Sequence, residues 1–419
     1  MREEIQSTDD GRQTTEEIQS TGDKRRIAAC IAVDRGPWTV DFLFLILLSF
    51  FISSCIRSGK DVNSLVKASA DKLENTYAKG FKIEKFKDFK VLTVYNPWQH
   101  AQGVEYKYVL AENTDAVPDS LKKFDVIKIP VKRIVCLSTT HLAFLKELNQ
   151  LDAICGVSAP EFIYDSLIRE KVNAGKISNV GYDQAMNIET IISLKPDFIM
   201  AYGVGSESSG QFQRLKQLGI KVVFNAEYLE QTPLGKAEWL NFVGAFFNKE
   251  DSAAQLFKIT SETYTNLAKK AASVKEKPMV LSGLPWKGAW YVPGGKSYAS
   301  NFIYDAGGDY LWKEDNGSES IPLSLETVLE RANKAQLWIN PGSALNLSEM
   351  AMFDPRIKTI RSLQEKKVFN FNRRLSPGGG NDFWESGVVH PDLILKDLIA
   401  IFHPDLIPNH TFAYYQLLN

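Results

Sequence analysis

Two short stretches of the chain carry a glutamate in the same setting. Residues 186–192 read MNIETII and residues 323–329 read LSLETVL. Each stretch has a residue that can cap a helix, an apolar residue, the glutamate (Glu189 or Glu326), a threonine and two apolar residues. A carboxylate in the first turn of a helix is favoured by the helix dipole. The pattern predicts two exposed acids at matching points of two helices. Acids that only stabilise their own helices are the alternative.

Aromatic side chains gather in loops, where they would suit a bulky planar or amphipathic ligand. The densest loop is LPWKGAWYVPGGKSY, residues 284–298, and single aromatics occupy comparable strand-end or loop positions elsewhere. The predicted aromatic ligand contacts are Trp286, Trp290, Tyr291, Tyr202, Trp239 and Trp384. Ordinary packing of loops against the body of the protein would account for about half of them.

Three polar side chains follow strand-like runs and are further ligand candidates. Arg373 and Arg374 come directly after KKVFNFN, and paired guanidinium groups suit anionic oxygen ligands. His141 stands just past the run RIVCLS, at the start of a helical segment, where α/β proteins place ligands. The alternatives are surface charges beside the glycine-rich loop for the arginines, and a partly exposed residue of a first helical turn for His141.

Motifs of the common enzyme classes are missing from the sequence. The stretch GVGSESSG (203–210) has serine where a dinucleotide-binding loop needs its third glycine. There is no Walker loop, no G-x-S-x-G and no H-E-x-x-H, and the five histidines lack the spacing of metal ligands. We therefore expect no catalytic residue, no metal centre and no resident cofactor. With 49 basic and 50 acidic residues, the charge also argues against nucleic-acid binding.

An apolar run near the N-terminus is typical of an export signal. Residues 42–52 are too few to span a bilayer, which needs about 20 residues, and suit the apolar core of a secretory signal. The run ends in Ile-Ser-Ser-Cys, which resembles a bacterial lipobox and predicts that Cys55 is lipid-modified. A buried core helix that happens to end in Ser-Ser-Cys is the alternative. Cys136 and Cys155 are expected to be small buried residues; a disulfide between them is the alternative.

The elements that would position these residues alternate between short strands and helices. From Pro130 onward, the order strand, helix, strand predicts a parallel α/β layer structure. The order starts again after Pro278, with SLETVL in the place of NIETII, which predicts two similar lobes. Between the lobes, helical spacing over about 253–275 predicts one long linking helix. Before them, alternating apolar and polar residues over 81–110 predict a small antiparallel set of strands.

The expected fold is α/β: two lobes with central, mostly parallel sheets joined by a single long helix, plus a small N-terminal antiparallel β segment. The predicted divisions are an N-terminal extension and signal peptide (1–54), a tether (55–80), the added β segment (81–130), the N-terminal lobe (131–236), the linking helices (237–276), the C-terminal lobe (277–404) and a C-terminal tail (405–419).

Two stretches of the chain carry a resemblance to a known family. The first is NIETIISLKPDFIMAYG (187–203), and the second is DAGGDYLW (305–312) followed by SLETVL. Over about 131–404 the chain resembles the bacterial ABC-transporter solute-binding proteins for ferric siderophores, haem and cobalamin. The resemblance implies a ligand held between lobes that close only slightly, and contact of Glu189 and Glu326 with arginines of a membrane permease. The chain departs from the family in its added N-terminal residues and in a helix that opens T-T-H rather than T-E, so ligand residues are not transferred from other members.

We therefore expect a binding lipoprotein without catalytic activity, a monomer anchored at the cell envelope in the periplasm through Cys55. Its expected partners are an ABC permease of the inner membrane and a small-molecule metal chelate. A ferric siderophore leads because Arg373 and Arg374 suit an anionic complex; cobalamin is second, and haem, with Tyr202 or His141 as axial ligand, is third. A two-lobe lipoprotein enzyme or chelatase is the alternative of a different class.

Overall fold

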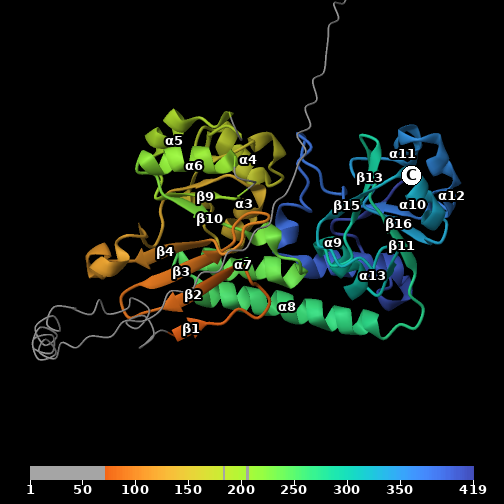
Figure 1. Cartoon of the computed structure of the whole chain (residues 1–419), viewed down its shortest axis with the longest axis horizontal. Helices are drawn as coiled ribbons and strands as arrows, with labels where there is room; N and C mark the ends of the chain where they lie inside the picture. Colours follow the sequence, from red (N-terminus) through yellow and green to blue (C-terminus); the bar gives the residue numbers. More distant parts are fainter. Residues whose placement is uncertain (1–70, 183–184, 204–206) are drawn as a thin grey trace, which may run out of the picture. The chain divides into compact units, whose positions relative to one another are not determined.

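The computed structural model describes residues 71–182, 185–203 and 207–419, and Figure 1 gives the arrangement of their helices and strands. The chain divides into two compact units, Met1–Lys60 and Asp61–Asn419, and all described residues belong to the second. The predicted signal peptide, the lipid attachment at Cys55 and most of the predicted tether lie outside the described residues. Within the described ranges, no helix combines the length and the apolar character that crossing a membrane requires.

The N-terminal lobe is built on a parallel sheet of short, mostly buried strands, here called sheet B. Its strand order is β10-β9-β6-β7-β8, and every neighbouring pair is parallel. The strands are β6 (Ile134–Cys136), β7 (Ile154–Val157), β8 (Ser178–Asn179), β9 (Phe198–Ala201) and β10 (Val222–Phe224). The helices are α3 (Thr139–Glu147), α4 (Ser166–Asn173), α5 (Ile188–Leu194) and α6 (Glu207–Gln217). The predicted alternation of strand and helix is confirmed, and Cys136 and Cys155 are buried free thiols on neighbouring strands.

The C-terminal lobe repeats this plan in sheet C, whose order is β14-β11-β16-β17-β18, with an added three-stranded antiparallel sheet D of order β12-β13-β15. The strands of sheet C are β11 (Met279–Ser282), β14 (Asp309–Tyr310), β16 (Leu337–Ile339), β17 (Val368–Asn370) and β18 (Gln416–Leu417). Sheet D comprises β12 (Pro285–Trp286), β13 (Ala289–Pro293) and β15 (Ser320–Leu323). The helices are α9 (Tyr298–Asp305), α10 (Leu325–Ala332), α11 (Leu347–Phe353), α12 (Arg361–Gln364) and α13 (Pro391–Phe402). Strand β18 lies in the predicted C-terminal tail, which therefore completes sheet C as an antiparallel edge.

The added N-terminal segment forms a five-stranded sheet, sheet A, of order β1-β2-β3-β4-β5. Its strands are β1 (Asp71–Leu73), β2 (Phe81–Lys85), β3 (Lys90–Tyr95), β4 (Glu105–Ala111) and β5 (Asp125–Lys128). The first four strands pair antiparallel, as predicted, but β4 and β5 pair parallel because two 3-10 turns carry the chain back between them. The sheet also begins ten residues earlier than the segment predicted from 81 onward.

Two helices link the lobes: α7 (Pro233–Ala245) and α8 (Glu250–Ala272), the long helix predicted from the sequence. Both helices contribute to both hydrophobic cores. Trp239 of α7 and Ala253 of α8 pack into the core that sheets A and B share, whereas Leu234 of α7 and Phe257 of α8 pack into the core of the C-terminal lobe. The link between the lobes is therefore a packed element rather than a flexible connection.

Candidate functional site

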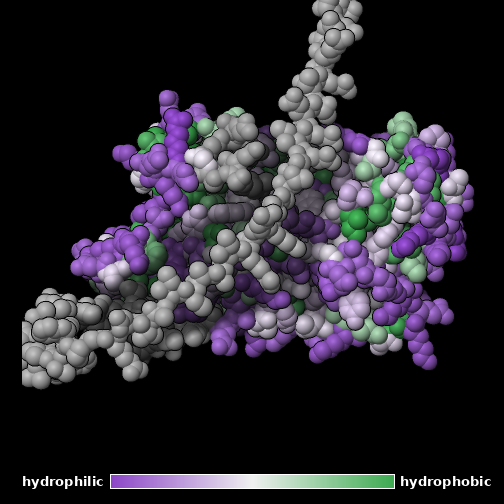
Figure 2. Space-filling view, in the orientation of Figure 1, coloured by the Kyte–Doolittle hydropathy of each residue, from purple (hydrophilic) through white to green (hydrophobic). Residues whose placement is uncertain are grey.

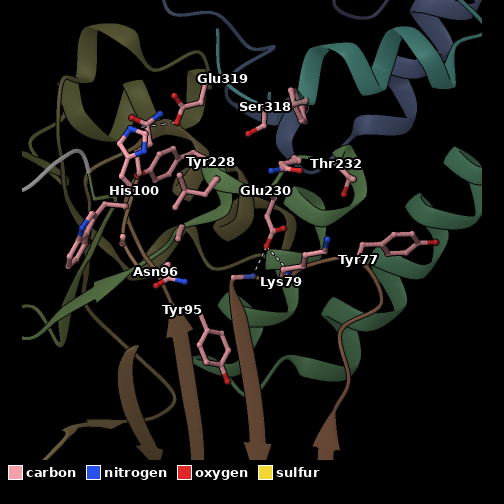
Figure 3. Close-up of a pocket in the computed structure, with 18 of the residues that line it drawn as sticks. Tyr77, Lys79, Tyr95, Asn96, His100, Tyr228, Glu230, Thr232, Ser318 and Glu319 are labelled. Atoms are coloured by element: carbon pink, nitrogen blue, oxygen red, sulfur yellow. Dashed lines mark hydrogen bonds and ion pairs between the residues drawn. The ribbon is translucent and has the colours of Figure 1, made fainter. Parts of the chain in front are cut away.

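A cavity of about 790 Å³ is bounded by three separate parts of the chain (Figure 3). This volume lies within the range of about 300–1,000 Å³ that small-molecule sites occupy. Sheet A and its loops contribute Tyr77, Lys79, Gly80, Tyr95, Asn96, Trp98, Gln99, His100 and Ala101; the segment after β10 contributes Ala226 and Tyr228–Thr232; the C-terminal lobe contributes Tyr298 and Ser318–Ser320. We call the turn from Asn96 to Val104, which joins β3 to β4, the Trp98 turn.

The Trp98 turn is held in one conformation by its own backbone and by packing. Asn96 adopts a left-handed φ of 44°, donates its backbone N–H to the carbonyl of Val104 (2.8 Å), and accepts the backbone N–H of Val104 on its side-chain oxygen (3.0 Å). The indole of Trp98 meets the rings of Tyr106 and Phe224 edge-on, at centroid distances of 6.0 Å each. The turn is therefore anchored both on sheet A and on β10 of the N-terminal lobe.

Gly203, two residues past the end of β9, allows the Trp98 turn to approach the N-terminal lobe. A Cβ atom at this position would lie 2.7 Å from the carbonyl oxygen of Pro97 and 3.1 Å from Cβ of Trp98, too close for any side chain. The hydroxyl of Tyr228 donates a hydrogen bond to the carbonyl of Gly203, and its ring lies 6.5 Å from that of Tyr202. The cavity thus lies outside the carboxyl ends of β9 and β10, where open α/β sheets bind their ligands.

Two buried carboxylates fix the wall that sheet A contributes. Glu230 accepts the backbone N–H groups of Lys79 and Gly80, both at 2.8 Å, and the indole N–H of Trp239 at 3.1 Å. Glu238 of α7 accepts the backbone N–H groups of three further residues, at 2.8, 2.7 and 2.6 Å; they are Thr76, Tyr77 and Ala78. Charge-assisted hydrogen bonds of this kind are roughly twice as strong as neutral ones. The segment before β2 is therefore clamped to the N-terminal lobe.

The polar groups around the cavity carry little net charge. His100 of the Trp98 turn and Glu319 of the C-terminal lobe approach to 3.7 Å with exposed side chains, so the pair contributes little stability but brings the two walls together. Lys79 is the lysine of the lining, and Glu230 is its other acidic residue. The remaining polar lining is neutral: Asn96, Gln99, Gln231, Thr232, Ser318 and Ser320.

Three predicted ligand contacts are core residues. Trp239 and Trp290 have no exposed surface: Trp239 donates to Glu230, and Trp290 stacks on Trp338 at 5.3 Å and donates to the carbonyl of Ser282 (3.2 Å). His141 is equally buried, and burial lowers its pKa to about 3. A side chain without exposed surface cannot contact a ligand in this conformation, so we correct the prediction for these three. His141 also loses its candidacy as an axial ligand of haem.

Three other predicted aromatics are exposed but lie away from the cavity. Figure 2 shows that hydrophilic residues dominate the face seen in Figure 1, with smaller hydrophobic areas between them. Trp286 and Tyr291 of sheet D are 58% and 42% exposed, with ring centroids 6.2 Å apart. Trp384 is 51% exposed and packs edge-on against Phe371. Their roles as ligand contacts stay predictions, and so does that of the half-buried Tyr202, whose neighbour Tyr228 lines the cavity.

The predicted arginine pair is divided by the structure. Arg373 is exposed, whereas Arg374 forms an ion pair with the buried Asp382 at 3.0 Å. Its guanidinium also lies over the rings of Tyr164 (5.1 Å) and Tyr414 (5.5 Å), one from each lobe. Arg374 therefore joins the lobes, and its charge is already paired.

The same junction contains a carboxylate shared between the lobes. Glu385 accepts the backbone N–H groups of Tyr164 (2.7 Å) and Asp165 (2.9 Å), and burial raises its pKa to about 7. Gly380 lies so close to the carbonyl of Phe162 that a Cβ atom would come within 1.9 Å of it. The lobes are thus in direct backbone contact on this side.

The paired glutamates lie as the sequence predicts. Glu189 is exposed in the first turn of α5, where Asn187 accepts the backbone N–H of Thr190 at 2.9 Å. Glu326 is exposed in the first turn of α10, where Ser324 accepts the backbone N–H of Thr327 at 3.2 Å. The capping prediction is confirmed at both helices.

The surroundings of the two glutamates differ. Arg356 pairs with Glu326 at 2.6 Å and with Asp354 at 2.9 Å. The pKa of Glu326 is lowered, first by a hydrogen bond from the backbone N–H of Glu326 itself and then by a hydrogen bond from the guanidinium of Arg356. No ion pair or hydrogen bond of the Glu189 side chain occurs within the part of the chain that the structure describes.

None of the predicted ligand contacts lines the cavity, and of its lining residues only Tyr298 belongs to the aromatic loop marked from the sequence. The stretch NPWQHAQG lies between two alternating strands and combines turn formers with an aromatic residue, which is the signal that would have marked the Trp98 turn. Ser318 and Glu319 lie in a polar loop and offered no such signal. Their part in the cavity follows only from the packing of the two lobes.

The comparisons with known proteins agree with this architecture. The family model described as periplasmic binding protein matches residues 134–374. An uncharacterized lipoprotein of Methanocaldococcus jannaschii is 30% identical over 331 residues, which cover 75% of this chain and 77% of the relative. A vitamin B12-binding protein of Salmonella typhi is 32% identical over 152 residues, 36% of this chain and 51% of the relative. A solved structure described as a possible iron-binding, periplasmic solute-binding protein from Staphylococcus epidermidis is similar in fold, with a TM-score of 0.51 and 19% identity over 65% of this chain and 98% of that one.

Proposed function

The chain belongs to the ABC-type periplasmic binding protein family, and on that premise we propose that it captures an organic metal chelate and delivers it to a membrane permease. The observation that carries the proposal is the cavity of about 790 Å³ at the carboxyl edge of sheet B, lined by aromatic and neutral polar side chains. Such a lining suits a ring system with polar substituents, because aromatic faces bury its surface and amide or hydroxyl groups fix its orientation.

Among metal chelates, we place a cobalamin-type ligand first. Its corrin ring bears uncharged amide groups, which match the amides of Asn96, Gln99 and Gln231. The similarity to a vitamin B12-binding protein over part of the chain supports the same choice. A ferric siderophore, which led on the sequence alone, becomes second because Arg374 is already paired with Asp382. Arg373 is exposed and keeps that alternative open to test.

A titration tests the ligand class. The purified full-length chain would be titrated with cyanocobalamin, with the anionic tris-catecholate siderophore ferric enterobactin and with haemin by isothermal calorimetry and tryptophan fluorescence. We expect saturable binding of cyanocobalamin in the micromolar range or tighter, with the ligand recovered chemically unchanged. Binding of ferric enterobactin alone would move the siderophore to first place, and a Soret band on purification would favour haem. Binding of none of the three, or turnover of any, contradicts the proposal.

We also propose that Glu189 and Glu326 dock the protein on its permease. Both are exposed acids at the same position of corresponding helices, one in each lobe, so they offer a partner two negative points. In the double variant Glu189→Lys and Glu326→Lys, uptake of the bound ligand should fall at least tenfold while its affinity stays within twofold of the unaltered protein. The control is Glu262→Lys with Glu276→Lys, two exposed acids at α8 and just after it. Undiminished uptake in the first double variant would refute the docking role.

A further inference from the structure

We infer that sheet A is a third wall of the ligand site and that the Trp98 turn determines which chelates fit. The inference rests on the proposed function, since it concerns the same ligand and the same cavity. The family match begins at residue 134 and leaves sheet A out. The wall therefore lies outside the part of the chain that the family model matches.

The Trp98 turn lies at the strand ends of the N-terminal lobe. Gly203 allows the backbone of Pro97 to lie against the end of β9, and Trp98 packs against Phe224 at the end of β10. These are the strand ends at which a ligand of an α/β lobe is held. A ligand that reaches this edge of sheet B must contact the Trp98 turn.

The Trp98 turn and the segment that leads into sheet A are held by several hydrogen bonds. The turn is closed by two hydrogen bonds between Asn96 and Val104. The segment that leads into sheet A is clamped by Glu230 and Glu238, each through several backbone N–H groups. Because the wall is already ordered in the free protein, binding does not have to order it, and the entropic cost of binding is lower. Such a wall also selects by shape, because it cannot readily yield to a ligand of another form.

The Trp98 turn also reaches the C-terminal lobe. Figure 3 shows His100 of the turn and Glu319 of the C-terminal lobe directed toward one another, and their closest atoms are 3.7 Å apart. Tyr298 lines the C-terminal side, where the ammonium of Lys236 lies 4.2 Å from its ring centroid. The cavity is consequently enclosed by sheet A as well as by the two lobes.

The side chains of the turn indicate the chemistry they would recognise. Trp98 and the neighbouring Tyr95 offer aromatic surface, and the amides of Asn96 and Gln99 each provide donors and an acceptor. An uncharged ring system with amide substituents could pack on the aromatic surface and form hydrogen bonds with the amides. An anionic chelate would have no guanidinium to pair with among the described residues that line the cavity. The turn therefore favours the corrinoid type over an anionic ferric chelate.

A matched pair of glycine variants tests the wall without altering any lining side chain. Gly203→Ala introduces a methyl group where Pro97 leaves no room, so the turn must shift; at Gly210 of α6 a Cβ atom meets nothing within 4 Å. With cyanocobalamin as the probe, Gly203→Ala should raise the dissociation constant at least tenfold and Gly210→Ala should leave it within twofold. Trp98→Ala should weaken binding by a similar factor.

A variant at exposed residues of the turn separates weaker binding from loss of the fold. Trp98 and Gly203 pack against the core, whereas Gln99 and His100 are exposed, so the double variant Gln99→Ala and His100→Ala should melt with the unaltered protein. We expect this variant to bind cyanocobalamin at least fivefold more weakly, and the ratio of its dissociation constants for ferric enterobactin and cyanocobalamin should be smaller than that of the unaltered protein. Circular dichroism melting of every variant accompanies the titrations.

The outcomes separate this inference from the proposed function. If the unaltered protein binds a probe and every variant of the turn binds it equally well, the third wall is refuted and the proposed function stands. If Trp286→Ala or Trp384→Ala weakens binding and the turn variants do not, the ligand lies at the residues expected from the sequence, and the inference is again overturned. If the unaltered protein binds none of the probes, both the proposed function and the inference fall.

Discussion

Four buried carboxylates each accept hydrogen bonds from backbone N–H groups distant in the sequence: Glu230, Glu238, Glu385 and Asp397. Glu230 and Glu238 hold sheet A, Glu385 holds the two lobes together, and Asp397 of α13 holds the C-terminal segment through the N–H groups of residues 413–415. A buried carboxylate is costly unless its oxygens are satisfied. At the residue scale, these acids therefore specify which distant segments must meet.

Glu385 makes the stability of the lobe junction depend on pH. Burial raises its pKa from 4.5 to about 7, so between these values the folded state binds more protons than the unfolded state, and the free energy of unfolding falls as pH rises. In Glu385→Gln this contribution is absent. The free energy of unfolding of the unaltered protein, minus that of the variant, should therefore fall by about 3 kcal/mol between pH 4 and pH 8. Urea unfolding over that range measures the difference. Parallel curves for the two proteins would contradict the assignment, and the exposed Glu319→Gln is the control.

At the scale of helices and strands, local patterns in the sequence predicted the elements well. The alternation of strands and helices, the caps Asn187 and Ser324, and the linking helix near α8 are properties of short windows of sequence. Trp239 was misassigned although the apolar residues of its helix are not confined to one face, which indicates a buried helix. The cavity itself had no local signal, because its walls come from three distant parts of the chain, within residues 77–101, 226–232 and 298–320. Only the assembled structure brings them together.

The clamp on sheet A gives an element-scale prediction. Glu238→Ala removes the acceptor of three backbone N–H groups, which would be left unsatisfied beside α7. A buried donor without a partner costs about 1–3 kcal/mol, so we expect the variant to lose about 3 kcal/mol or more of stability. Hydrogen exchange should show the loss first in residues 76–78 and in β2. The control Glu276→Ala, at an exposed position, should change neither quantity. Unchanged protection of β2 in Glu238→Ala would show that the clamp is dispensable.

At the scale of the described molecule, α7 and α8 belong to the cores of both lobes. A helix that packs into two cores makes the loss of one core destabilise the other, so the lobes should unfold together. The small closing movement that the family resemblance implies stays a prediction.

Matched core variants test this cooperativity. Phe198→Ala in sheet B and Phe302→Ala in α9 each remove a buried ring, one from each core, at a cost of about 3–5 kcal/mol. We expect both variants to show one urea transition, with the same midpoint by circular dichroism and by tryptophan fluorescence. Five of the tryptophans lie in the C-terminal lobe: Trp286, Trp290, Trp312, Trp338 and Trp384. A fluorescence midpoint that does not move in Phe198→Ala would show that the lobes unfold separately.

The clamped segment before β2 also sets a limit on how far the chain can be trimmed. Glu230 and Glu238 lie inside the matched residues 134–374, whereas all the backbone N–H groups that they accept, in residues 76–80, lie outside. A protein reduced to the matched residues would retain both acids without these five donors, and only the indole N–H of Trp239 would remain for Glu230. It would also lack β18, which completes sheet C. The segment by which the family is recognised is thus shorter than the shortest self-sufficient folding unit of this chain.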